Sequence, residues 1–132
     1  MRPLLPSAAL ALALALMGCA PEIGDDCSSS VDCSVNGDRI CDAAQPGGYC
    51  SVANCEEGTC PEDAVCVEFR YEPARLAESW CMAPCEGDDD CREADGYRCI
   101  HASQLMEGDA HIARVLDGGG DDGRRFCAAV LE

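Results

Sequence analysis

Residues 27–50 read CSSSVDCSVNGDRICDAAQPGGYC, and four cysteines divide this stretch into three short loops. A segment of about 25 residues buries too little apolar surface to be stable alone, and exported domains of this size rely on disulfide bonds. A glycine pair and Tyr49 come directly before the last cysteine. The stretch therefore predicts a small crosslinked unit with little regular secondary structure.

The same arrangement continues in two further groups of four cysteines. The three units run over 27–50, 55–81 and 85–127, with only short gaps between them. The first and third units share the spacing C-x5-C-x7-C, with Asp32 and Asp90 directly before the second cysteine. We interpret this pattern as a degenerate internal repeat of three tandem units with short β-hairpins.

An aromatic residue precedes the fourth cysteine of every unit, namely Tyr49, Trp80 and Phe126. Aromatic residues make up only 5% of the chain, so three such matches by chance are rare. We expect each aromatic ring to cover the disulfides of its own unit. The second unit departs from the pattern because Thr59 stands where the other units have aspartate.

Twelve cysteines in an exported chain indicate six disulfide bonds and no free thiol. Each group of four permits three different pairings. We favour bonds from the first to the third and from the second to the fourth cysteine, because interleaved loops make each unit most compact. The cysteines concerned are Cys27, Cys33, Cys41, Cys50, Cys55, Cys60, Cys66, Cys81, Cys85, Cys91, Cys99 and Cys127.

The thirteenth cysteine, Cys19, follows an apolar N-terminal run. Residues 4–17 are almost entirely leucine and alanine and follow Arg2, which is typical of a secretory signal peptide. The run is shorter than the roughly 20 residues that a membrane-spanning helix needs. An ordinary secretory signal would leave Cys19 as an odd thiol, whereas lipidating it leaves an even number of cysteines for pairing.

The stretch LMGC at 16–19 resembles the lipobox of bacterial lipoproteins. The resemblance implies that residues 1–18 are a signal peptide, that Cys19 carries the lipid anchor and that residues 19–26 form a lipidated tether. Ala20 after the cysteine implies sorting to the outer membrane of the cell envelope. The tether would keep the first unit within about 25 Å of the anchor.

The lipobox, the repeated C-x-x-x-x-D-C motif and the GGYC motif at 47–50 resemble cysteine-rich lipoproteins of high-GC predatory soil bacteria such as myxobacteria. The repeats are also distantly similar to the Dickkopf-type cysteine-rich pattern of secreted animal proteins. The resemblance covers residues 4–99. It implies a cell-envelope location and a disulfide-rich fold, and these families share no catalytic residues that transfer to this chain.

The chain is strongly acidic, with 25 aspartates and glutamates against 9 basic residues and a net charge of −16. Such a surface repels nucleic acid and anionic lipid headgroups, so we expect neither as a partner. The sequence contains no C-x-x-C and only two histidines, His101 and His111, which excludes the usual spacing of structural zinc sites. We expect neither a metal nor a cofactor.

Two other chemistries receive little support from the sequence. The acidic run at 88–90 and the acidic cluster at 117–122 offer oxygen ligands to calcium, but neither has the spacing of an EF-hand loop. We interpret both as solvated loops. His101 and His111 are accompanied by no nucleophile motif, so we predict that the protein is not an enzyme.

Regular secondary structure is expected to be sparse. The alternation of apolar and polar residues over 65–71 predicts a strand, and residues 73–80 are predicted to form two helical turns. One short helix is predicted over 109–116 in the last unit, with Asp109 as its N-cap.

The long loop at 100–126 departs from the repeat, and we expect it to carry recognition. A disulfide scaffold presents rigid loops, and rigidity lowers the entropic cost of binding. The function we expect is a lipid-anchored binding or structural module of the cell envelope with a protein partner. A membrane-tethered protease inhibitor, presenting residues 70–79 or 104–125, is the first alternative, and a calcium-dependent adhesive module is the second.

Overall fold

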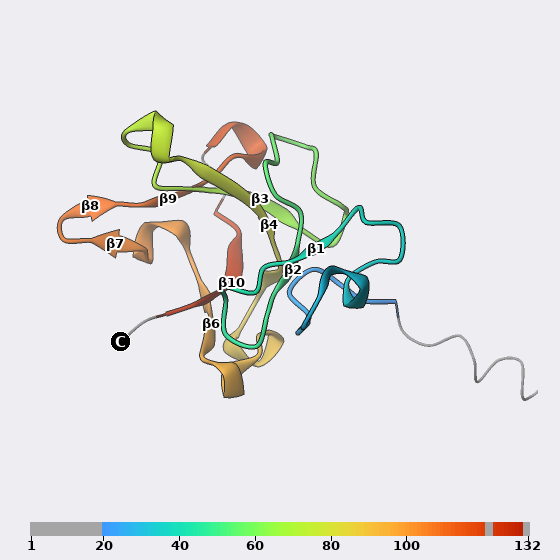
Figure 1. The fold of residues 1–132 in the computed structure, drawn as a ribbon. Helices are drawn as coiled ribbons and strands as arrows, with labels where there is room; N and C mark the ends of the chain where they lie inside the picture. Colours follow the sequence, from blue (N-terminus) through green and yellow to red (C-terminus); the bar gives the residue numbers. More distant parts are fainter. Residues whose placement is uncertain (1–19, 121–122, 131–132) are drawn as a thin grey trace, which may run out of the picture.

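The computed structural model describes residues 20–120 and 123–130, which form a small fold of short antiparallel strands and 3-10 turns (Figure 1). The predicted signal peptide at 1–18 and the predicted lipidation residue Cys19 lie outside this part of the chain. Among the described residues there is no α-helix, and each helical turn is three or four residues long. The prediction of a small, disulfide-rich fold with little regular secondary structure is confirmed.

The strands of the described residues form four antiparallel sheets. Two sheets have two strands each: β1 (Ile40–Cys41) with β2 (Cys50–Ser51), and β7 (Met106–Glu107) with β8 (Ala110–His111). A third sheet has the order β4-β3-β9, made of Glu78–Met82, Val65–Phe69 and Ala113–Val115. The fourth has the order β5-β10-β6, made of Pro84–Cys85, Arg125–Ala129 and Tyr97–Ile100.

The described chain has six 3-10 turns, one before β1 and the others between strands. They are η1 (Ser30–Asp32), η2 (Ala74–Leu76), η3 (Asp88–Asp90), η4 (Glu93–Asp95), η5 (Ala102–Gln104) and η6 (Asp117–Gly120).

Six disulfide bonds crosslink the described chain, and each joins two cysteines of the same group of four. In every group the first cysteine bonds the third and the second bonds the fourth, so the predicted pairing is confirmed. The bonds are Cys27–Cys41, Cys33–Cys50, Cys55–Cys66, Cys60–Cys81, Cys85–Cys99 and Cys91–Cys127.

Strand register accounts for this pairing. The third and fourth cysteines of each group lie directly opposite one another in an antiparallel ladder: Cys41 faces Cys50, Cys66 faces Cys81, and Cys99 faces Cys127. The first and second cysteines come from the segment before the ladder, which is irregular in the first two groups and begins with β5, carrying Cys85, in the third. Their disulfides therefore fasten that segment to the two opposed strands.

Gly48 allows the first group to close. The turn between β1 and β2 has positive φ angles at Gly47 and Gly48, 68° and 74°, a region that glycine adopts without steric cost. A Cβ atom added to Gly48 would overlap the backbone carbonyl of Cys27. Only glycine fits at this position, because the turn packs directly on the start of the same group.

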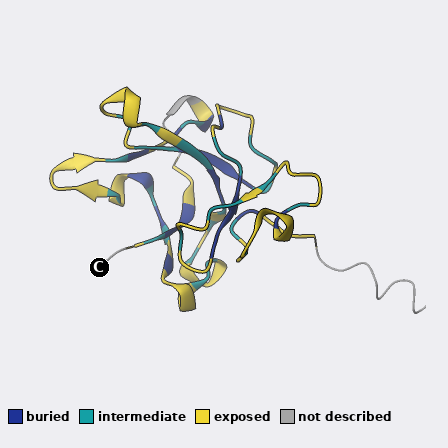
Figure 2. Cartoon of the chain, viewed as in Figure 1, coloured by how far each residue is buried: buried dark blue, intermediate teal, exposed yellow. Residues whose placement is uncertain are grey.

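The three cysteine groups share one core. Its buried members come from all of them, including Tyr49 of the first group, Val67 of the second and Phe126 of the third. Figure 2 shows the buried positions gathered where the sheets meet. The rings of Phe69 and Phe126 pack edge to face, with centroids 6.3 Å apart, and join the second group to the third.

The short helix predicted over 109–116 is not formed. Residues in this range form β8 and β9 instead, and β9 pairs along β3 with Val115 opposite Val67. Burial alternates here, since Ala113 and Val115 are buried and Arg114 is exposed. Pairing with the edge of β3 stabilises a strand here, although the apolar residues have a helical spacing.

The other predicted elements are partly formed. The strand predicted over 65–71 is present as β3. The two helical turns predicted over 73–80 shrink to the single turn η2, because residues from Glu78 onward pair with β3 as β4.

Candidate functional site

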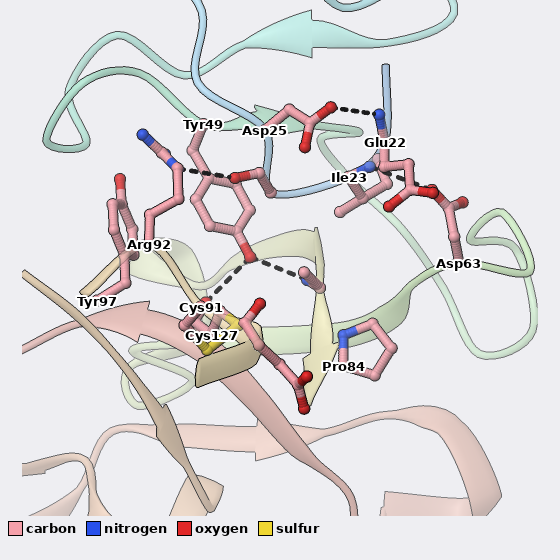
Figure 3. Close-up of a pocket in the computed structure, with 13 residues that line it drawn as sticks. Glu22, Ile23, Asp25, Tyr49, Asp63, Pro84, Cys91, Arg92, Tyr97 and Cys127 are labelled. Carbon is pink, nitrogen blue, oxygen red and sulfur yellow. Dashed lines mark hydrogen bonds between the residues drawn. A yellow bond between two sulfur atoms is a disulfide. The ribbon is translucent and has the colours of Figure 1, made fainter. Parts of the chain in front are cut away.

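A pocket of about 270 Å³ lies where the N-terminal segment meets all three cysteine groups (Figure 3). We call it the junction pocket. Its wall includes Ile23, Tyr49, Asp63, Arg92, Tyr97 and Cys127.

The hydroxyl group of Tyr49 bridges two segments at the junction pocket. The hydroxyl donates to the carbonyl oxygen of Cys127 at 3.0 Å and accepts from the backbone N–H of Ala83 at 2.9 Å (Figure 3). Burial raises the pKa of Tyr49 well above its ordinary value, so the group stays neutral. The aromatic residue of the first group therefore reaches across to the third group, in addition to any contact with its own disulfides.

Arg92 supplies the positive charge of the junction pocket. Its Nε donates to the carbonyl of Gly24 at 3.1 Å, and a second nitrogen donates to the carbonyl of Gly48. The guanidinium also pairs with Asp95 at 2.7 Å. It stacks over the ring of Tyr97, 4.5 Å from the centroid.

Most polar groups of this pocket make hydrogen bonds within the fold. The Tyr97 hydroxyl donates to the carbonyl of Pro46 at 2.7 Å, and burial raises the pKa of Tyr97. Across residues 20–120 and 123–130, no buried side-chain nitrogen or oxygen lacks a hydrogen-bond partner. The wall also carries the carboxylates of Glu22, Asp25, Asp63 and Asp90, and the last three accept backbone hydrogen bonds. Because its tyrosines, its arginine and three of its carboxylates are hydrogen-bonded within the fold, we interpret the junction pocket as the place where the groups are fastened together.

Asp117 fastens the long loop of the third group to the second group. Its Oδ1 accepts from the N–H of Gly58 and its Oδ2 from the N–H of Cys66, both at 2.8 Å. Arg124 lies 3.7 Å from Oδ2. Asp117 is therefore a buried structural carboxylate and not part of a solvated loop, while residues 121–122 lie outside the described chain.

The residue before the second cysteine caps a turn in every group. Asp32 accepts from the two backbone N–H groups that follow the first cysteine, at 2.8 and 3.0 Å, and Asp90 does the same at 2.8 and 3.3 Å. These hydrogen bonds lower the pKa of Asp32 and of Asp90. Thr59 accepts from the N–H that follows Cys55 at 2.8 Å, so it is the counterpart of the aspartates.

The two histidines lie in different settings. His101 caps η5, and its Nδ1 lies 2.7 Å from the hydroxyl of Ser103. His111 is exposed on β8 opposite Met106. The structure gives His101 a capping role and places His111 on an exposed hairpin.

The β7–β8 hairpin projects from the body (Figure 1). Both of its strands are exposed, as Figure 2 shows, and Ile112 donates to the carbonyl of Leu105 at 3.0 Å at its base. Elsewhere in the predicted recognition loop at 100–126, Ala102 and β9 pack into the core. Among the residues of that loop whose burial is described, 106–111 form the longest exposed run.

The sulfur atoms of each group are stacked. In every group the first three cysteine sulfurs lie within 4.8 Å of one another. They belong to closed disulfides, whereas metal ions bind thiolates. These clusters are therefore pairs of neighbouring disulfides.

No helix in the part of the chain that the structure describes is long and apolar enough to cross a membrane.

No protein-family model, curated protein or solved structure matches this chain.

The sequence marks some of these contacts and not others. The residues that cap turns are marked by their position before the second cysteine. The backbone partners of Arg92 are 44 to 68 positions away and those of Asp117 are 51 to 59 positions away, so no local pattern in the sequence predicts them.

Proposed function

We propose that the protein is a binding module of the cell envelope, anchored to the outer membrane by a lipid on Cys19 and directed at a protein partner. The observation that carries the binding part is the β7–β8 hairpin. Its residues 106–111 are exposed on both strands, while the loop on either side is fastened to the core. A hairpin held in this way pays little entropy on binding.

The scaffold, in this proposal, consists of three tandem units over 27–50, 55–81 and 85–127. The shared disulfide pairing, the opposed third and fourth cysteines and the capped turn before the second cysteine support this division. Because the units share one core, we expect them to fold together.

The anchor rests on the lipobox-like stretch at 16–19 and on cysteine parity. The six disulfides use twelve of the thirteen cysteines, and Cys19 is the remaining one. Replacing Cys19 by serine should move the protein from the detergent phase to the aqueous phase. A wild-type protein that stays in the aqueous phase and lacks acyl mass on Cys19 would contradict the anchor.

The hairpin can be removed with little disturbance to the rest of the fold. Leu105 and Ile112 already form the hydrogen bond that closes a two-residue turn, so Asn-Gly can replace residues 106–111. Envelope proteins crosslinked to the wild type would be identified by mass spectrometry, and the dissociation constant of the purified partner would be measured. We expect the shortened variant to lose the interaction.

A matched control tests whether a change in another exposed loop also weakens binding of the partner. Leu76 on η2 is 54% exposed, and Leu76→Ser should leave the dissociation constant unchanged. Binding that survives hairpin removal but is lost with Leu76→Ser would place the site on the β3–β4 loop instead.

The protease-inhibitor alternative receives little support from the geometry of residues 70–79, whereas its other loop, 104–125, includes the same β7–β8 hairpin. Proteases bind substrates as extended strands, and residues 70–79 form the turn η2 and the start of β4. Leu76, the exposed apolar side chain of this loop, lies in the turn itself.

A further inference from the structure

The segment after Cys19 is folded into the body. The Pro21 carbonyl accepts from Nη1 of Arg39 at 3.2 Å, and the N–H of Ile23 donates to Oδ2 of Asp63 at 3.1 Å. Ile23 is 4% exposed and belongs to the shared core. The tether expected over 19–26 is therefore docked from Pro21 onward.

Arg39 and Asp63 hold this segment as a clasp. Their side chains form two parallel hydrogen bonds of 3.1 Å, a bidentate pair that fixes both groups. Beyond the clasp, Gly24 and Asp25 exchange backbone hydrogen bonds with Cys50, each of 2.9 Å. The segment is thus fastened at successive points along its length.

Docking leaves little free chain between the anchor and the body. Only Ala20 stands between Cys19 and the first fastened residue, Pro21. Two Cα–Cα steps span at most about 7.6 Å. With a lipid on Cys19, the surface around Pro21 lies at the headgroups, far closer than the 25 Å that a free tether would allow.

Exposed apolar side chains lie beside this point. Val31 is 72% exposed, Val35 92% and Ile40 36%, and all three belong to the first cysteine group. Ile40 follows Arg39 in the chain, and the residue before Val35 accepts a hydrogen bond from the Arg39 N–H at 3.1 Å. Figure 2 shows η1 as exposed on the side where the described chain begins.

We propose that Pro21, Val31, Val35 and Ile40 form a face that rests on the bilayer surface, a deduction that depends on the proposed lipid anchor at Cys19. We call it the bilayer face. The lipid supplies the attachment and the short segment supplies the orientation. The occupant is a zwitterionic phospholipid surface, because the carboxylates of Asp32 and Asp38 border the face and repel anionic headgroups.

This orientation turns the β7–β8 hairpin away from the membrane. In Figure 1 the first described residues and η1 lie on one side of the molecule and the hairpin lies on the other. The bilayer face would hold the scaffold down, and the hairpin would remain open to a partner.

Quenching by brominated phospholipids tests the bilayer face. The mature lipidated protein with Trp80→Phe, which removes the single native tryptophan, is reconstituted in phosphatidylcholine vesicles with brominated acyl chains. Val35→Trp in this background should be quenched several-fold more than Met106→Trp, the matched control on the hairpin. Val31→Trp provides a second probe should the first variant fail to fold.

A flexible Gly/Ser linker inserted between Ala20 and Pro21 tests the role of the short segment. Flotation with vesicles should persist, and quenching of the Val35→Trp variant should fall towards that of the hairpin control. Undiminished quenching with the linker would overturn the role of the segment. Equally weak quenching of both variants in a protein that floats would overturn the bilayer face while leaving the anchor intact. Absence of flotation and of acyl mass on Cys19 would overturn the anchor, and the bilayer face with it.

Discussion

Gly48 and Gly37 differ in why they are glycine: both have a positive φ angle, but only Gly48 is also closely packed. Both have positive φ, 74° and 76°. A Cβ on Gly37 would meet nothing within 4 Å, whereas on Gly48 it would overlap the Cys27 carbonyl. We expect Gly37→Ala to lower the free energy of unfolding by about 1 kcal/mol and Gly48→Ala to cost several times more. Urea unfolding of the oxidised proteins measures both, and equal losses would contradict the close packing at Gly48.

Asp63 makes the N-terminal clasp sensitive to acid. Burial raises its pKa, but the Ile23 N–H and the Arg39 guanidinium outweigh burial and leave the pKa below its ordinary value. A pKa that is lower in the folded state contributes stability above about pH 4, and this stability is lost as the pH falls through the folded value.

We therefore expect Asp63→Asn to lower the melting temperature at pH 7 and to weaken its fall on acidification. Thermal unfolding between neutral and acidic pH measures both effects. Asp26→Asn, which changes an exposed carboxylate in the same segment, is the control and should alter neither. An Asp63→Asn protein with the wild-type acid profile would show that the clasp does not depend on this charge.

At the level of the elements, we expect a disulfide that closes a longer loop to contribute more to the free energy of unfolding. The Cys91–Cys127 bond closes a separation of 36 residues and the Cys55–Cys66 bond one of 11. In the chain-entropy picture these bonds stabilise by about 4 and about 3 kcal/mol respectively. Replacing each pair by two alanines and measuring urea unfolding should show the larger loss for the longer loop. The reverse order would mean that native contacts, not chain entropy, decide.

The elements also show how far the sequence could be interpreted. Short spacings restrict which cysteines can meet, so the pairing within each group could be predicted. The strand predicted over 65–71 is formed over 65–69. The helix expected over 109–116 failed because its apolar residues fit two periods. Ile112, Val115 and Leu116 follow a helical spacing, whereas Ala113 and Val115 alternate. The strand was formed because the edge of β3, a partner more than 40 residues away, pairs with it.

At the scale of the whole molecule, the three cysteine groups are crosslinked separately but packed together. Every disulfide stays within its group, while Tyr49, Phe126 and Asp117 each contact a different group from their own. None of these contacts was marked in the sequence, because each depends on how finished units meet. The same holds for Ile23, which turned an expected tether into part of the core.

This organisation places the proposed anchor and the proposed binding hairpin on different sides of the molecule. The described N-terminal segment and η1 lie on one side of the molecule, next to which we propose the anchor, and the β7–β8 hairpin lies on the other side (Figure 1). Rigid packing between them would transmit the orientation set at the membrane to the hairpin.

Peptide mapping of the mature protein without reduction tests whether Cys19 carries the lipid and the other twelve cysteines form three groups with two disulfides each. It accounts for all thirteen cysteines in one measurement. We predict acyl mass on Cys19, first-to-third and second-to-fourth bonds within each group of four, and no labelling by a thiol reagent. A bond between two groups, a first-to-second bond within a group, or two or more labelled cysteines would contradict it.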